Sequence, residues 1–301
     1  MYAAKVHNPP LAATLIAVAC AFIAATTLIA KALATEQFGA SMHPFQIVFG
    51  RFLFAFLAFA LATAILRPPL QRPHLPLHVA RTMGGWAGLA LMFASVAHIP
   101  LADATAISFL NPVFGMIFAI PLLGEKVGKW RWSAAGIAFV GAVILLRPTP
   151  DSFQPAALLA LGAAVILGFE LNIIKKLTRR ENPFSILLIN NAIGVCVAGF
   201  AVMWVWVWPT PEQWALMAVL GCAMAVAQTC FVNAMARADA SFVAPFSYGT
   251  LIFAALYDVL FYDVVPDGVT IAGAAIIIAG ALFLAWREGR RVRPEHRHAP
   301  L

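Results

Sequence analysis

The stretch Leu101-Ala102-Asp103-Ala104-Thr105 decides the fold, because a close copy of it opens a second apolar run later in the chain. The copy is Arg237-Ala238-Asp239-Ala240-Ser241, 136 residues further on. Pro44-Phe45 and Pro183-Phe184, which each precede an apolar run, are 139 residues apart. The sequence therefore predicts an internal repeat that divides the chain into two similar halves.

The composition predicts that both halves lie in a lipid bilayer. Hydrophobic residues make up 62% of the 301 residues and charged residues only 11%, whereas soluble domains contain about 25% charged residues. The mean hydropathy of +0.87 agrees with this. A chain with so little charge can cover its outside only by facing lipid.

Several apolar runs are long enough to cross a bilayer, since a spanning helix needs roughly 20 mainly apolar residues. Proline, glycine and charged residues separate them, and the expected spans are 11–34, 44–66, 79–97, 102–122, 131–147, 153–175, 184–208, 213–235, 240–261 and 268–286. We therefore predict an all-α membrane protein with ten transmembrane helices.

The predicted halves are residues 1–147 and 148–286, and residues 287–301 form a basic cytoplasmic tail. Each half contains five of the expected spans. Since five is odd, the second half enters the membrane from the opposite side. This predicts two inverted five-helix repeats, an arrangement that many secondary transporters use.

Positive charges predict the orientation, because membrane proteins keep Lys and Arg on the cytoplasmic side. With the N-terminus inside, all of the 20 Lys and Arg residues except Lys31, Arg51 and Arg147 fall in cytoplasmic segments. We expect a multi-pass protein of a bacterial-type inner membrane with both termini cytoplasmic. The net charge of +7 then reflects topology, and nucleic acid is not an expected partner.

With this topology, the sequence resembles the drug/metabolite transporter superfamily, in particular its ten-helix EamA-type exporters. The resemblance covers essentially the whole chain and rests on Ala97-His98-Ile99-Pro100 before the deciding stretch, on Asn111-Pro112 and on Leu123-Gly124-Glu125-Lys126. In the second half the chain departs from the glycine-glutamate pattern, with Phe261-Tyr262-Asp263 at the end of the ninth span.

This resemblance implies a secondary transporter that exports small metabolites by alternating access. Within the superfamily the chain is most similar to the YddG-type aromatic amino-acid exporters, so the expected substrates are aromatic or other neutral amino acids. Other hydrophobic metabolites or drugs are the alternative. The resemblance also implies that spans three, four, eight and nine surround the cavity, while spans five and ten pack behind them.

The repeated motifs contain residues with expected structural roles. Asp103 and Asp239 stand at helix starts, where a carboxylate can accept hydrogen bonds from free backbone N–H groups. For Glu125 at the end of the fourth span we expect an interfacial salt bridge. Pro112 and Pro245 each remove one helical hydrogen bond, so the spans containing them are expected to be kinked, as hinges or as static features.

Polar side chains at membrane depth are the candidates for substrate contact. Asn111 and Ser247 occupy matching repeat positions and should fall near the midplane, where repeat-built transporters bind substrates. Interhelical hydrogen bonds are the alternative role for each. The other predicted substrate-binding residues are Ser108, Trp86, Phe114, Gln228, Tyr248 and Asn190.

Glu170 is the acidic residue expected to act in coupling or gating, together with Pro112 and Pro245. It lies about one helical turn before Lys175 and could pair with it or take up a proton during transport. An aromatic cavity with few charges suits a hydrophobic or zwitterionic solute. A phosphorylated solute would need a buried pair of basic residues, and we expect only Arg51 in the cavity.

Other classes of protein lack a sequence signal. The chain contains no HExxH, GxSxG or P-loop motif, so an intramembrane enzyme is disfavoured and no catalytic residues or cofactors are predicted. The four cysteines lack CxxC spacing and predict no metal site. A channel would need a ring of like groups about an axis. The expected partners are a small-molecule substrate and membrane lipid, and nothing indicates the oligomeric state.

Overall fold

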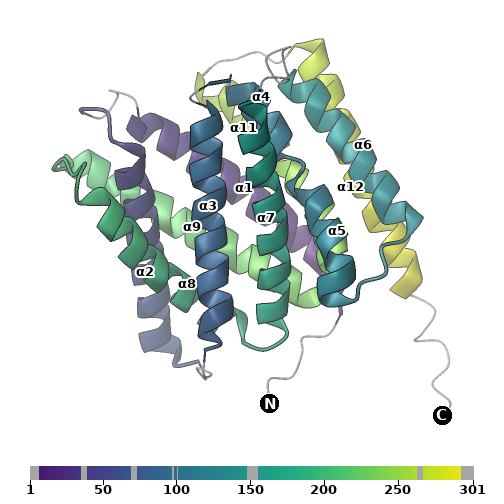
Figure 1. Cartoon of the computed structure of the whole chain (residues 1–301), viewed down its shortest axis with the longest axis horizontal. Helices are drawn as coiled ribbons and strands as arrows, with labels where there is room; N and C mark the ends of the chain where they lie inside the picture. Colours follow the sequence, from purple (N-terminus) through teal and green to yellow (C-terminus); the bar gives the residue numbers. More distant parts are fainter. Residues whose placement is uncertain are drawn as a thin grey trace.

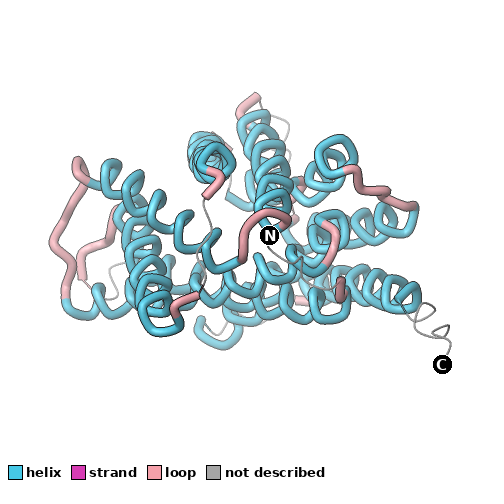
Figure 2. The backbone as a smooth tube through the Cα atoms, turned by 90° about the horizontal axis from the view of Figure 1, so that it is seen from below, coloured by secondary structure: helices cyan, strands magenta, loops and turns pink. Residues whose placement is uncertain are grey.

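The computed structural model describes residues 7–34, 39–68, 73–96, 98–99, 101–147, 155–262 and 267–292. All regular structure in these ranges is helical, as the view from below also shows (Figure 2). The elements in Figure 1 are α1 (Pro9–Ala34), α2 (Pro44–Leu66), α3 (Leu75–Val96), α4 (Leu101–Ser108), α5 (Asn111–Leu123), α6 (Lys129–Leu146), α7 (Ala157–Thr178), α8 (Pro183–Val202), α9 (Pro211–Arg237), α10 (Ala240–Val243), the 3₁₀ helix η3 (Ala244–Tyr248), α11 (Gly249–Tyr262) and α12 (Gly268–Val292).

Within the described residues, 9 helical segments are long and apolar enough to cross a membrane. Two of them, Ala104–Leu123 and Ala240–Phe261, combine several of the shorter elements. Helix α3 is not among the nine, so the tenth span stays a prediction. Helix α12 continues to Val292, so the first part of the predicted tail is helical, and residues 293–301 lie outside the described part.

The fourth span is broken between α4 and α5, next to Pro112. Proline has no N–H, so the carbonyl of Ser108 four residues earlier loses its helical donor. The Asn111 side chain replaces that donor, with Nδ2 2.9 Å from Ser108 O. The break that Pro112 predicts is therefore present, and Asn111 stabilises it.

The ninth span is broken around Pro245, where η3 separates α10 from α11. Ser247 Oγ donates to Ala244 O at 2.6 Å inside this segment. Tyr248 is fully buried and donates from its hydroxyl to Phe109 O at 2.7 Å, and the two rings stack with centroids 5.7 Å apart. The two broken spans therefore contact each other at their breaks.

Helices α6 and α12 pack against each other at one edge of the molecule (Figure 1). A Cβ atom at Gly141 would lie 2.8 Å from Gly273 O, and one at Gly280 would lie 3.1 Å from Ala134 O. These contacts require glycine and show that the two helices run antiparallel. Beyond α6, Arg147 pairs with Asp267 and holds the pKa of that exposed carboxyl well below its usual range.

The α9–α10 junction is held by charged side chains from the first half and from α7. Glu125 Oε1 accepts from Ala240 N at 2.8 Å, and its Oε2 accepts from Ser241 N at 3.0 Å and Ser241 Oγ at 2.6 Å. Arg131 donates to Asp239 Oδ2 at 2.9 Å. Lys175 Nζ donates to the carbonyls of Met235, at 2.6 Å, and Ala238. We call Glu125, Arg131, Lys175, Asp239 and Ser241 the junction cluster.

The junction cluster corrects two predictions. Asp239 occupies the N-cap position of α10 but makes no side-chain capping bond, because it pairs with Arg131 instead. The cap comes from Glu125, which is buried among backbone N–H groups of the other half rather than in an interfacial salt bridge. The Asp103 side chain lies outside the described part of the structure.

Candidate functional site

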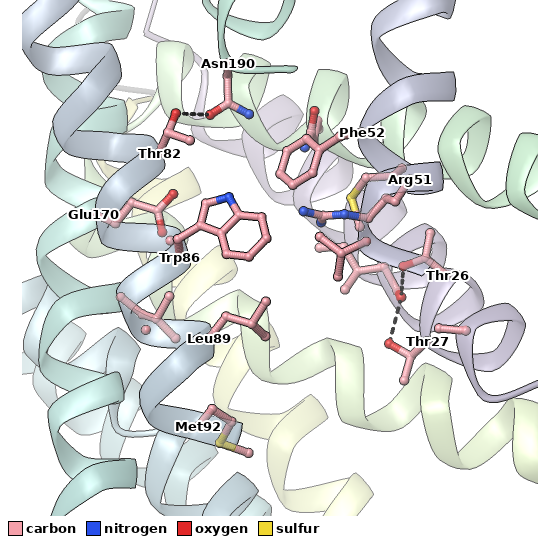
Figure 3. A pocket seen from close by; sticks show the side chains of 18 of the residues that line it. Thr26, Thr27, Arg51, Phe52, Thr82, Trp86, Leu89, Met92, Glu170 and Asn190 are labelled. Carbon is pink, nitrogen blue, oxygen red and sulfur yellow. Dashed lines mark hydrogen bonds between the residues drawn. The ribbon is translucent and has the colours of Figure 1, made fainter. Parts of the chain in front are cut away.

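A cavity of about 630 Å³ lies among α1, α2, α3, α7, α8 and α9, with one residue from α4 (Figure 3). Its walls are mainly apolar, but several polar and charged groups face it. These are Thr26, Thr27, Arg51, Arg81, Thr82, Trp86, Ser108, Glu170, Asn190 and Gln228. A volume of this size lies within the range of roughly 300–1,000 Å³ that small-molecule sites occupy.

Helix α3 supplies one wall of the cavity because of its residue spacing. Arg81, Gly85, Leu89 and Met92 recur at intervals of three or four and line the cavity, as one face of an α-helix does. Close to this face, α3 touches α7, where a Cβ atom at Gly88 would lie 2.9 Å from Leu167 Cδ2. The absence of a side chain there lets α7 approach closely.

This close approach brings Glu170 of α7 toward Arg81 of α3. Glu170 Oε1 lies 3.8 Å from Arg81 Nε, and the two side chains are 20% and 6% exposed. A second guanidinium, that of Arg51 on α2, lies 4.3 Å from the centroid of the Phe52 ring. The described lining thus contains two guanidinium groups and one carboxylate.

These positions correct two further predictions. Glu170 does not pair with Lys175, because the Lys175 ammonium is bound to backbone carbonyls in the junction cluster. The expectation that Arg51 is the only basic residue of the cavity is also wrong. Helix α3 begins at Leu75, about one turn earlier than predicted, so Arg81 lies in the second turn of the helix instead of the first and faces the cavity.

Trp86 lies between Glu170 on one side and Arg51 with Phe52 on the other (Figure 3). Its Nε1 atom is buried without a hydrogen-bond partner, and so are Nε and Nη1 of Arg81. Nearby, Thr82 Oγ1 is 3.4 Å from Asn190 Oδ1. The buried polar atoms of the cavity that lack partners, among the described residues, are therefore N–H donors.

The structure brings together part of the predicted site. Five predicted residues line the cavity: Trp86, Ser108, Glu170, Asn190 and Gln228. The remaining six are not part of its lining: Asn111, Pro112, Phe114, Pro245, Ser247 and Tyr248.

The six residues outside the lining lie at the helix breaks or in packing contacts. Phe114 packs at the α5–α7 contact, where a Cβ atom at Gly168 would lie 2.6 Å from Phe114 Cβ. The described lining contains no residue of α10, η3 or α11, so the wall expected from the ninth span is supplied by α1, α2, α7 and α8 instead. Direct substrate contact by the six residues stays a prediction.

Helical segments that are long and apolar enough to cross a membrane, packed around a cavity with a few convergent polar groups, define a multi-pass membrane protein with a small-molecule cavity. The EamA-like transporter family model matches residues 10–147 and 154–286, and the chain therefore belongs to this family. The prediction of an EamA-type membrane transporter is confirmed.

Three relatives of this chain are named after different transported compounds. The chain is 28% identical to the S-adenosylmethionine uptake transporter of Rickettsia prowazekii, over 87% of this chain and 90% of that protein. It is 35% identical to the riboflavin transporter of Rhizobium johnstonii, over 74% of each. It is 28% identical to the pseudopaline exporter of Pseudomonas aeruginosa, over 83% of this chain and 89% of that protein.

A crystal structure with 20% sequence identity has a TM-score of 0.78 over 95% of this chain and 100% of its own, which supports the fold alone. None of the three relatives is described as an aromatic amino-acid exporter. The narrower prediction of a YddG-type protein therefore has no support from them.

Proposed function

We propose that the chain is a secondary transporter that carries a small metabolite across a bacterial inner membrane by alternating access. The observation that carries this proposal is the cavity, in which Trp86 lies between Glu170 and Arg51 and which Arg81 also lines. Ionisable groups within membrane helices are costly and are usually functional. A planar ring beside charges of both signs suits an organic solute with a flat part and a charged part.

The helix packing supports the proposed inverted repeats, residues 1–147 and 148–286. The second span of each half is α2 and α8, and these two helices pack antiparallel. A Cβ atom at Gly194 would lie 2.2 Å from Phe52 Cδ1, and one at Gly199 would lie 3.5 Å from Phe49 Cε2. Helices α6 and α12, the last span of each half, are also antiparallel. Corresponding helices of inverted repeats run in opposite directions.

On α1 and α2 the cavity lies toward one end of each helix, which supports alternating access. It is lined by residues 23–30 of α1 and 47–52 of α2. The other halves of these helices, with Ile16 and Phe59, belong to a large buried apolar cluster that includes Leu177 and Met235. With both termini cytoplasmic, as the Lys and Arg distribution predicts, the described conformation is closed on the cytoplasmic side.

The names of the relatives add two compounds to the candidate substrates. S-adenosylmethionine and riboflavin both contain a planar heteroaromatic ring, which could stack on Trp86. Amino acids, aromatic ones first, remain candidates, as do other hydrophobic metabolites. Phosphorylated solutes were disfavoured because only one basic residue was expected in the cavity. Arg51 and Arg81 both line it, so this reason no longer holds. Export remains our proposed direction.

A counterflow assay in proteoliposomes tests the proposal. The purified protein is reconstituted, and labelled S-adenosylmethionine, riboflavin and L-tryptophan are offered to vesicles preloaded with the same unlabelled solute. We expect saturable counterflow of at least one solute. Because Trp86 lines the cavity, Trp86→Ala should reduce it about tenfold or more, equivalent to roughly 1.4 kcal/mol.

The matched control is Trp208→Ala, which alters a tryptophan that is 80% exposed and outside the cavity lining. It should transport like the unmodified protein. Non-saturable flux without counterflow would identify a channel, and equal effects of the two substitutions would show that this cavity is not the substrate site.

A further inference from the structure

We infer that the cavity binds a carboxylate group of its substrate, with Arg81 and Trp86 as the hydrogen-bond donors and Arg51 as a second positive charge. The inference rests on the proposed function, because it names the substrate class of the same cavity. It assigns to Glu170 the role of counter-ion of Arg81 when the site is empty.

The hydrogen-bond inventory leaves several N–H donors of the cavity residues without an acceptor in the protein. Nε and Nη1 of Arg81 and Nε1 of Trp86 are buried and have no hydrogen-bond partner. Arg81 is only 5% exposed and lines the cavity. Buried donors are normally paired, because an unpaired one loses its hydration without compensation. Guanidinium and indole N–H groups can only donate, so the missing partner is an acceptor.

Glu170 does not fill this role in the described structure. Its carboxylate lies 3.8 Å from Arg81 Nε, which is longer than a hydrogen bond. Glu170 therefore partly balances the charge of Arg81 but leaves the N–H groups of Arg81 and Trp86 without an acceptor. Arg81 and Trp86 both line the cavity, so a substrate acceptor could bind these donors after a rotation of the two side chains and displace the weaker interaction.

The charge of the cavity favours a monoanionic group. Arg51 and Arg81 carry two positive charges and Glu170 one negative charge, so the described lining has one excess positive charge. One carboxylate balances this charge, whereas a phosphate dianion would introduce an uncompensated negative charge into an apolar surrounding, where charges are poorly solvated. The Trp86 ring lines the same cavity, so the substrate class is a carboxylic acid with a planar ring.

The test compares an acid with its neutral isostere in equilibrium binding to the purified full-length protein. The probes are labelled indole-3-acetate and indole-3-acetamide, which share the ring and differ in charge. We expect the acid to bind at least about tenfold more tightly, since charge-assisted hydrogen bonds are about twice as strong as neutral ones. Phenyl phosphate is the third probe and should bind more weakly than the acid.

Variants assign the preference to individual donors. Trp86→Phe keeps an aromatic ring and removes the Nε1–H, so it should weaken acid binding severalfold and leave amide binding nearly unchanged. Arg81→Gln should abolish the preference for the acid, and Arg81→Lys should restore part of it by returning the charge. Arg180→Gln, which removes an exposed arginine on the α7–α8 connection, is the control and should bind like the unmodified protein.

The inference is overturned by equal binding of acid and amide, by binding of neither, or by tighter binding of phenyl phosphate. Retention of the full acid preference in Arg81→Gln would do the same. Counterflow in vesicles separates this outcome from a failure of the proposed function. Acid binding without counterflow removes the transport proposal alone, and counterflow of other solutes without acid preference removes the carboxylate inference alone.

Discussion

At the scale of single residues, Glu125 and Tyr248 each make a hydrogen bond between the two halves of the chain. Glu125 caps α10, and its partner Ala240 is 115 positions away in the sequence. Tyr248 satisfies the Phe109 carbonyl at the break of the other broken span. In lipid each freed backbone group must find a partner inside the protein. These contacts therefore stabilise the irregular segments of the bundle.

Glu125→Gln tests the cap. Glutamine can accept from one backbone N–H but places an amide donor against the other, so we expect the apparent melting temperature in detergent to fall. The expected loss is about 1–3 kcal/mol for a hydrogen bond to a charged group. Lys126→Gln changes the exposed neighbouring residue and should leave the melting temperature unchanged. Equal melting temperatures for both variants would show that the cap contributes little.

At the scale of elements, the bundle depends on glycines at the helix contacts. Gly141 of α6 lies against the backbone of α12, where a Cβ atom would be 2.9 Å from Ile277 N. Backbone cannot move aside as a flexible side chain can. The same helix also contains Gly136, where a Cβ atom would meet nothing within 4 Å.

These two glycines form a matched pair for mutagenesis. Gly141→Ala should destabilise the protein by about 1–3 kcal/mol through overpacking. Gly136→Ala should be neutral or stabilise it by up to about 1 kcal/mol, because alanine is the better helix former. Thermal unfolding in detergent measures both changes. If Gly141→Ala has no effect, α6 and α12 are not in the described contact.

At the scale of the whole molecule, the proposed inverted repeats make corresponding helices begin at opposite membrane faces. Helix α3 begins at Leu75 and corresponds to α9, which begins at Pro211. Single cysteines at position 73 and position 208 would therefore stand on opposite sides. Both positions are exposed.

Cysteine labelling in cells tests this topology, after Cys20, Cys196, Cys222 and Cys230 have been replaced by serine or alanine. Trp208→Cys should react with a membrane-impermeant maleimide in intact cells, whereas Pro73→Cys should react only after the membrane is opened. Lys126→Cys is the internal control and should behave like Pro73→Cys. Labelling of positions 73 and 208 from the same side would contradict the inverted arrangement.

The sequence predicted the helices better than the cavity, for physical reasons. Pro44, Pro183 and Pro211 begin α2, α8 and α9, since proline is favoured in the first turn of a helix. Pro112 and Pro245 likewise marked both breaks, because the missing N–H is a local property of the residue.

The site depends on contacts between distant segments, which local patterns do not contain. Arg81 was assigned to a cytoplasmic segment because charge near a span end usually faces water, but α3 begins earlier and turns Arg81 inward. Asn111 has a polar side chain of the kind that binds ligands. In the structure its amide instead donates to the Ser108 carbonyl, which Pro112 leaves without a helical donor. Arg51 within an apolar span was the signal that sequence reasoning undervalued.

The excess positive charge of the cavity gives the proposed transport cycle an electrical asymmetry. The empty carrier moves this charge when it reorients, whereas the carrier loaded with a monocarboxylate moves none. One elementary charge crossing the bilayer is worth about 2.3 kcal/mol per 100 mV, so the membrane potential acts mainly on the unloaded return step. A negative cell interior attracts the empty site toward the cytoplasm, where it can load again, and so favours outward delivery.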